Sequence, residues 1–147
     1  MANAWTAEQM PDCSEKTVVV TGANSGLGFE ATKAFARKGA TVVMACRSIE
    51  RGKRAAHEIR DSITERTGAR LNVRQCDLAS LESVAEFADG VREDCDDLHI
   101  LCNNAGVMAI PRQETEDGFE MQLGGPRLAH QALPAPPRGR TSTTSTA

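Results

Sequence analysis

Short apolar runs alternate along the chain with longer stretches in which apolar residues recur every three or four positions. The short runs are typical of buried parallel strands, and they cover residues 17–21, 40–46, 69–76 and 98–102. The stretches between them predict three helices, each with one apolar face. These faces consist of Leu27, Ala31, Ala34 and Phe35, then Ala55, Ile59 and Ile63, and then Leu81, Val84, Ala85, Ala88 and Val91.

Serines and glycines mark where the predicted helices begin and end. Ser48 and Ser80 stand directly before the second and third helical patterns, as N-cap residues do. Gly39 follows the first pattern, and Gly68 closes the connection after the second. Strand and helix therefore alternate, which predicts an α/β fold: a Rossmann-type, doubly wound parallel sheet of about four strands in the order 3-2-1-4.

The turn after the first strand is rich in glycine. It reads TGANSGLG, with Gly22, Gly26 and Gly28 in a G-x-x-x-G-x-G spacing. Glycines permit a tight turn and let the main chain approach a pyrophosphate, whose charge is met by the N–H groups at the start of the next helix. Three glycines in a turn are also compatible with a simple loop, but their place between a strand and a helix favours a phosphate site.

A second turn signal, NNAG, directly follows the fourth predicted strand at residues 103–106. In a doubly wound sheet the ligand lies outside the carboxyl ends of the strands, where the strand order reverses. With the order 3-2-1-4, that point lies between strands one and four. Both glycine-containing turns are therefore expected to face one crevice.

These two motifs, on these elements and at this separation, resemble the short-chain dehydrogenase/reductase family over residues 16–123. The phrases ACRS at residues 45–48, and NNAGVM through ETEDGFE, are most similar to its retinol-dehydrogenase-like and protochlorophyllide-reductase-like branch. The resemblance implies a nicotinamide cofactor and hydride transfer between NADP(H) and an alcohol or carbonyl compound. It also implies that residues 1–123 form an incomplete NAD(P)-binding Rossmann domain.

The resemblance assigns cofactor contacts position by position. Asp77 and Leu78 would contact the adenine ring, although Asp77 also suits a turn or helix cap. Asn103, Ala105 and Gly106 would lie beneath the nicotinamide ribose, with Asn103 also tying the sheet together. The residues placed along the pyrophosphate and its ribose are Gly22, Asn24, Ser25, Gly26, Leu27 and Gly28.

The end of the second strand indicates which nicotinamide cofactor is preferred. A dinucleotide site carries either an acid that binds the ribose 2′-OH or an arginine that accommodates a 2′-phosphate, about 20 residues past the glycines. Here the strand ends in MACRS, with no acid, and Arg47 follows Gly28 at that distance. We therefore expect NADP to bind better than NAD. Alternatively, Arg47 is only a solvated residue that opens a basic helix start.

Catalytic residues are not evident. The family's general acid/base is a tyrosine in a Y-x-x-x-K motif, and this chain contains no tyrosine. Where the family usually has an asparagine-containing helix after strand four, Pro126 falls on the asparagine position and would break that helix. We therefore identify no catalytic residue, and two interpretations remain: the N-terminal part of an oxidoreductase, or a non-catalytic nucleotide-binding remnant. A small-molecule substrate is expected only for a full-length form.

The last residues of the chain differ in composition from the rest. From Met121 onward there is no acidic residue, a proline cluster occupies residues 134–137, and the chain ends in TSTTSTA. Such a segment buries too little apolar surface to offset its ordering entropy, so residues 124–147 are expected to be a disordered, low-complexity tail. Loss of later strands would also leave the fourth strand as an exposed apolar edge.

Composition narrows the remaining possibilities. A net charge of −3 is too small to suggest nucleic acid as a partner, and no run of about 18 apolar residues predicts a transmembrane segment. With no secretory leader pattern, a cytoplasmic location is expected. The five cysteines lack CxxC spacing, so we expect buried free thiols and no metal site. His57 and His99 suggest only structural roles, and the sequence leaves oligomerisation open.

Overall fold

The computed structural model describes residues 4–63, 67–106, 111–124 and 142–145. A short 3-10 helix, η1 (Ala7–Gln9), precedes the sheet. The strands are β1 (Thr17–Thr21), β2 (Thr41–Cys46), β3 (Arg70–Gln75), β4 (Ile100–Asn103) and β5 (Ser142–Ser145). The helices are α1 (Gly26–Arg37), α2 (Ile49–Ser62), α3 (Leu81–Asp94) and the one-turn α4 (Met121–Leu123).

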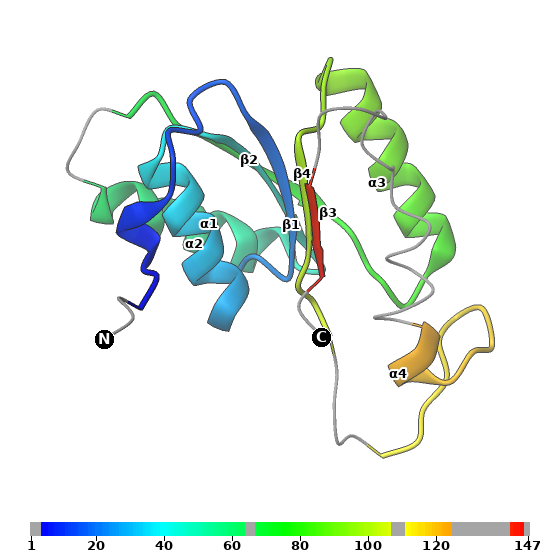
Figure 1. The fold of residues 1–147 in the computed structure, drawn as a ribbon. Coiled ribbons are helices and arrows are strands. Elements are labelled where there is room, and N and C mark those ends of the chain that lie inside the picture. Colours follow the sequence, from blue (N-terminus) through cyan, green and yellow to red (C-terminus); the bar gives the residue numbers. More distant parts are fainter. Residues whose placement is uncertain (1–3, 64–66, 107–110, 125–141, 146–147) are drawn as a thin grey trace.

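The strands form one parallel sheet in the order β3-β2-β1-β4-β5 (Figure 1). Val18 of β1 pairs with Val42 of β2 on one side and with Ile100 of β4 on the other. The expected Rossmann-type sheet with strand order 3-2-1-4 is therefore confirmed. Because β1 lies at the centre, the turn that follows it faces the point where the chain reverses direction across the sheet.

Helices cover both faces of this sheet. α1 and α2 pack on one face, and α3 packs on the other, at the right in Figure 1. Side chains alternate along β1, so that Val18 and Val20 join the first core and Val19 joins the second. All three valines are fully buried, which explains why β1 is a continuous apolar run.

The buried face of α1 differs from the predicted one. Its buried residues are Gly28, Thr32 and Ala36, whereas Leu27 is 77% exposed. The helix is thus rotated by about one residue from the position that its apolar pattern predicts. The rotation brings Gly28 against the preceding turn. The buried Thr32 hydroxyl group donates a hydrogen bond to the Gly28 carbonyl oxygen at 2.8 Å, so its burial leaves this donor paired. On α3, Ala85 is exposed, contrary to the prediction, and Phe87, which was not part of the predicted face, is buried.

The predicted helix boundaries agree with the structure. Ser48 and Ser80 are the N-caps of α2 and α3, and their hydroxyl groups accept hydrogen bonds from the N–H groups of Arg51 and Ser83, each at 3.3 Å. Gly39 adopts a left-handed φ of 86° just after α1, where an L-residue with a side chain would be strained. Because β1, β2 and β3 pair in parallel, their carboxyl termini share one edge of the sheet.

A fifth strand occupies part of the segment that was expected to be unstructured. β5 pairs in parallel with β4, with Ile100 opposite Ser142 and Leu101 opposite Thr143. Its serines and threonines supply no apolar surface, but their backbone groups pair with the edge of β4, and threonine favours strand conformation. Pro126 and most of the tail lie outside the described residues.

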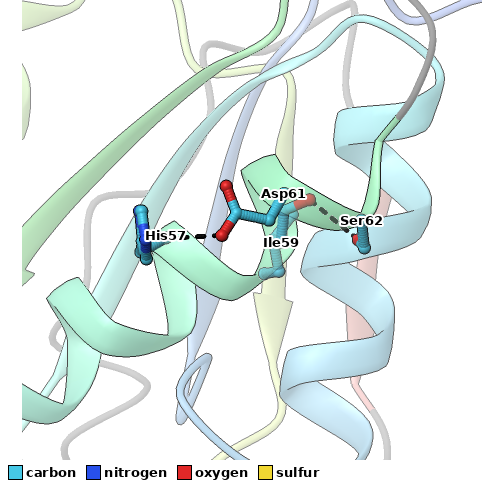
Figure 2. A network of polar contacts seen from close by, with 4 residues as sticks. All are labelled: His57, Ile59, Asp61 and Ser62. Carbon is cyan, nitrogen blue, oxygen red and sulfur yellow. Dashed lines mark hydrogen bonds and ion pairs between the residues drawn. The ribbon is translucent and has the colours of Figure 1, made fainter.

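Both histidines outside the tail have structural environments. The backbone N–H of Thr17 donates to His99 Nδ1 at 3.0 Å, while the His99 N–H donates to the Thr17 carbonyl oxygen at 2.9 Å, so this pair joins the first residue of β1 to the start of β4. His57 is exposed on α2, with its Nε2 atom 3.3 Å from the Asp61 carboxylate (Figure 2). On the same helix, the Ser62 hydroxyl group donates a hydrogen bond to the Ile59 carbonyl oxygen at 2.8 Å.

No helix in the described part of the chain is both long and apolar enough to cross a membrane.

Candidate functional site

The glycine turn between β1 and α1 has the backbone shape that its sequence predicts. Gly22 and Gly26 adopt left-handed φ values of 63° and 57°, which glycine reaches without a steric penalty. Ser25 is the N-cap of α1, but its side chain makes no capping hydrogen bond. The positive end of the α1 dipole therefore lacks the side-chain cap that α2 and α3 have, an arrangement suited to an anion.

Gly28 lets α1 start directly against this turn. A Cβ atom built on Gly28 would collide with the Gly22 carbonyl oxygen and would lie 2.5 Å from Asn104 Nδ2. Gly28 is accordingly buried, although the residues around it are exposed or half-buried. Its role is close packing of helix and strand, so that the start of α1 is held at the end of β1.

Thr21, the last residue of β1, connects the glycine turn to the second turn. Its fully buried hydroxyl group accepts hydrogen bonds from the N–H groups of Asn104 and Ala105, both at 3.0 Å. The Asn104 side chain donates to the Thr21 carbonyl oxygen at 3.1 Å. A Cβ atom on Gly22 would lie 3.1 Å from Ala105 Cβ. The two turns are therefore in direct contact, as expected for one crevice.

The structure corrects one structural role at this junction. Asn104, and not Asn103, ties β4 to β1 through its side chain. Asn103 Oδ1 is buried and, within the described part of the chain, has no hydrogen-bond partner.

A cavity of about 520 Å³ opens at the carboxyl ends of the strands, between these turns. Eight of the twelve residues predicted for the cofactor line it: Gly22, Asn24, Ser25, Arg47, Asp77, Leu78, Ala105 and Gly106. Gly26, Leu27, Gly28 and Asn103 do not line it. Sequence reasoning missed the other lining residues, which are Thr21, Ala45, Ser48, Arg51, Cys76, Ala79 and Met121.

Asp77 shapes the wall of the cavity at the end of β3. Its carboxylate accepts a hydrogen bond from the Ala79 N–H at 2.9 Å, and its own N–H donates to Ser83 Oγ at 2.9 Å. The turn role considered for Asp77 is therefore observed, and the residue also faces the cavity. Leu78, which is half-buried, gives this wall an apolar side chain.

Two arginines supply positive charge on the side of the cavity formed by β2 and α2. Arg47 is exposed at the carboxyl end of β2, and Arg51 lies in the first turn of α2. The guanidinium groups of both make no hydrogen bond or ion pair with any described residue. These cations are therefore available to an anionic ligand. Arg51 was recognisable only as part of a basic helix start.

The cysteines are free thiols, and four of the five are buried. Burial raises the pKa of Cys46 to about 11 and that of Cys76 to about 12. Cys76 lines the cavity, but a thiol with such a pKa is protonated at neutral pH and is a poor nucleophile. The site therefore has the character of a binding cavity with no activated nucleophile among the cysteines.

These features fit a dinucleotide. The glycine turn and the start of α1 suit a pyrophosphate, Leu78 and Met121 offer apolar surface to a base, and Arg47 and Arg51 offer charge to a further phosphate. The orphaned oxygen of Asn103 lies by the second turn and requires a hydrogen-bond donor.

Comparison with known proteins agrees with this geometry. A family model described as short chain dehydrogenase matches residues 16–132. Human retinol dehydrogenase 13 is 47% identical over 118 residues, which cover 80% of this chain and 35% of the relative. The chain thus spans about a third of the length of the curated relatives it matches.

Solved structures also resemble this chain in both sequence and fold. An uncharacterized protein from Mycobacterium paratuberculosis aligns with a TM-score of 0.76 and 44% identity, over 89% of this chain and 44% of that one. A metagenomic short-chain oxidoreductase, solved in complex with NADP, aligns with a TM-score of 0.58 and 32% identity, over 65% of this chain and 41% of that one.

Proposed function

The chain belongs to the short-chain dehydrogenase family, and from this premise we propose that its cavity binds a nicotinamide dinucleotide, NADP in preference to NAD. The observation that carries the proposal is the junction of two turns around Thr21, where Gly22 meets Ala105 at the mouth of a cavity of about 520 Å³. This junction lies at the reversal point of the sheet, where α/β folds bind nucleotides.

In this proposal the glycine turn holds the pyrophosphate. Gly22 and Gly26 keep the main chain open, while Ser25 and Leu27 offer backbone N–H donors at the uncapped start of α1. Asn24, which is half-buried and lines the cavity, contacts the ribose and the phosphate. Leu27 contributes its main chain only, which is consistent with its exposed side chain.

The positions of the two ends of the dinucleotide follow from the charge of Arg47 and from the strand order. Arg47 binds the 2′-phosphate through paired, charge-assisted hydrogen bonds. The adenine then lies against Asp77 and Leu78, because the ends of β2 and β3 are neighbours in the sheet. The nicotinamide ribose lies over Ala105 and Gly106, which line the cavity just after β4, next to Asn103.

The bound cofactor supplies hydride exchange with the carbon of an alcohol or carbonyl group. We propose this reaction for a protein that contains this domain, with a lipophilic alcohol as substrate, since the similar curated proteins are named retinol dehydrogenases. The reaction also requires a group that accepts the proton of the alcohol oxygen during oxidation, or donates one to the carbonyl oxygen during reduction, and the family uses a tyrosine for this. The 147 residues contain no tyrosine, so we propose that they bind the cofactor without turnover.

Calorimetric titration of the 147-residue chain with NADP⁺ and NAD⁺ tests the binding proposal. We expect saturable NADP⁺ binding that Gly26→Trp abolishes. Gly68→Trp is the matched control, because Gly68 also has a left-handed φ and open space around it but lies away from the cavity. Absence of nucleotide binding by the folded chain, or equal loss in both variants, would refute the proposed site.

A turnover assay separates the two catalytic interpretations. The purified chain is incubated with NADP⁺ and a secondary or long-chain alcohol, and NADPH absorbance is followed. We expect no turnover above the buffer rate although the cofactor binds. Turnover that disappears in Gly26→Trp would show that the chain is itself an oxidoreductase.

A further inference from the structure

Residues 113–121 form a small hairpin beside the start of α3. Glu114 and Glu120 form an antiparallel bridge, and the Met121 N–H donates to the Gln113 carbonyl oxygen at 2.8 Å. In Figure 1, α4, which begins at Met121, lies next to the first turn of α3. We refer to this unit as the 113–121 hairpin.

The hairpin has its own internal support. Thr115 is 7% exposed, and its N–H donates to the Phe119 carbonyl oxygen at 2.7 Å. The Thr115 hydroxyl group accepts the Phe119 N–H at 3.2 Å, and Gly118 turns the chain with a φ of 80°. The hairpin therefore holds its shape through local bonds, and its position depends on what attaches it to the domain.

Within the described residues, two hydrogen bonds attach the hairpin, one to the turn before α3 and one to the first residue of α3. The Glu116 N–H donates to the Ala79 carbonyl oxygen at 3.0 Å, and the Asp117 carboxylate accepts the Leu81 N–H at 2.9 Å. Leu81 is the first residue of α3, so Asp117 supplies both a cap and a negative charge at the positive end of the helix. Only the second of these bonds uses a side chain.

Both the segment that binds the hairpin and the end of the hairpin itself line the cavity. Ala79, which accepts the Glu116 N–H, is held on its other side by the Asp77 carboxylate and lines the cavity. Met121, at the end of the hairpin, is half-buried and lines the same cavity. A change in how the hairpin sits on α3 would therefore change the cavity wall.

We propose that Asp117 is a positioning residue for nucleotide binding: its hydrogen bond to Leu81 holds the 113–121 hairpin so that Met121 forms part of the wall against the adenine. This inference rests on the proposed function, because the adenine is placed by the 2′-phosphate at Arg47. The thioether of methionine suits a flat aromatic base, against which it makes favourable sulfur contacts. Asp117 touches no part of the nucleotide and acts through Met121.

Titration with adenosine 2′,5′-bisphosphate, which carries the base and the 2′-phosphate, tests this role on the full 147-residue chain. We expect Asp117→Ala to weaken binding about 5- to 10-fold, the size of one capping hydrogen bond. Asp117→Asn keeps an acceptor oxygen and is expected to restore binding to within about 2-fold of wild type. Glu82→Ala is the matched control, since it removes a negative charge from the first turn of the same helix and leaves the Asp117–Leu81 hydrogen bond in place.

A double-mutant cycle distinguishes positioning from general destabilisation. If Asp117 acts through Met121, then Asp117→Ala combined with Met121→Ala binds no more weakly than Met121→Ala alone. Additive losses, no rescue by asparagine, or unchanged binding in Asp117→Ala would overturn the proposal while leaving cofactor binding intact. Failure of the wild-type chain to bind either this bisphosphate or NADP⁺ would overturn the proposed function and this inference together.

Discussion

At the scale of single residues, the side chains around the cavity are of two kinds: some are hydrogen-bonded within the protein, and others have no polar partner among the described residues. Thr21 and Asn104 are used in joining the two turns, and Asp77 is used in holding Ala79. Arg47, in contrast, faces the cavity without an ion pair to any described residue. Substitution of a hydrogen-bonded residue is expected to change folding, whereas substitution of Arg47 is expected to change binding alone.

Arg47→Ala is therefore expected to weaken NADP⁺ binding by at least about 10-fold, since a hydrogen bond to a charged group contributes roughly 1.5 to 3 kcal/mol. NAD⁺, which lacks the 2′-phosphate, should bind nearly as before. Parallel calorimetric titrations of both cofactors measure the difference. Arg54→Ala, on the same helix start but outside the cavity, should leave both affinities unchanged. Equal affinity of the wild-type chain for NADP⁺ and NAD⁺ would contradict the assignment.

The buried thiols make the stability of the fold depend on alkaline pH. Burial raises the pKa of Cys46 to about 11 and that of Cys76 to about 12, against an ordinary value of 9.0. The native state therefore keeps its protons where the unfolded chain loses them, so the free energy of unfolding falls as the pH rises from 9 towards 11 to 12.

Urea unfolding followed at about pH 8 and at about pH 10.5 measures this dependence. The drop in stability should be smaller in a Cys46→Ala, Cys76→Ala double variant, whatever its stability at neutral pH. Cys95→Ala, which changes a half-buried thiol, should keep most of the drop. The absence of tyrosine simplifies the experiment, because no phenol ionises in this range. A pH dependence unchanged in the double variant would mean that these thiols do not cause it.

At the scale of elements, the close approach of α1 to the turn after β1 sets the shape of the site. Gly28 makes this approach possible, since a Cβ atom there would meet the Gly22 carbonyl oxygen. The Gly22 carbonyl group is main chain and cannot move aside without displacing the turn. The position therefore links helix packing directly to the cavity.

Gly28→Ala is expected to lower the free energy of unfolding, although alanine is the better helix former by about 1 kcal/mol. Overpacking against backbone typically costs roughly 1 to 3 kcal/mol, so the clash outweighs the gain in helix propensity. Gly90→Ala on α3 is the control, since its Cβ would meet only the flexible end of Arg74. Denaturant unfolding should show destabilisation in the first variant and little or none in the second. The opposite order would mean that α1 shifts freely.

Local patterns predicted the elements well because the responsible forces are local. Valine-rich runs specify β1 and β2, and serine caps fix the starts of α2 and α3. The face of α1 was predicted wrongly because the apolar Leu27 is exposed in its first turn, where the position of the glycines and not hydropathy sets the rotation. Eight predicted residues line the cavity because the strand order brings both turns together.

The hairpin contacts had no comparable signal in the sequence. Asp117 meets Leu81 across 36 positions, and nothing in either segment marks the pairing. Met121 was not among the predicted cofactor residues, because it lies near the end of the predicted domain, where the composition changes. β5 was not expected because serine and threonine bring no apolar surface, and its pairing depends on the backbone of β4 alone.

At the scale of the whole molecule, the sheet is protected unevenly. α1 and α2 cover one face and α3 covers the other, while β5 lies along the edge of β4. β4 contains Leu101 and Cys102, both buried, so its edge would become an apolar template for another chain if β5 left it. We therefore expect the pairing of β5 with β4 to limit self-association of the domain.

Deletion of residues 142–147 is expected to promote self-association through β4. Light scattering and binding of a dye specific for apolar surface should both increase relative to the intact chain. Substitution of Ser142–Ser145 by four alanines is the control, because it changes the side chains and retains the backbone groups that pair with β4. Monomeric behaviour of the deletion variant, with no added dye binding, would show that the edge of β4 needs no cover.

The central place of β1 also bears on the order in which the sheet is assembled. Its partner on one side, β2, follows after a single helix, whereas the pair between Thr17 and His99 joins residues that are 82 positions apart. Closing the longer loop costs more chain entropy and gives the pairing a high contact order. We expect the β1–α1–β2 unit to form early and β4 to dock late, which makes the reversal point, and with it the nucleotide crevice, among the last features of the fold to appear.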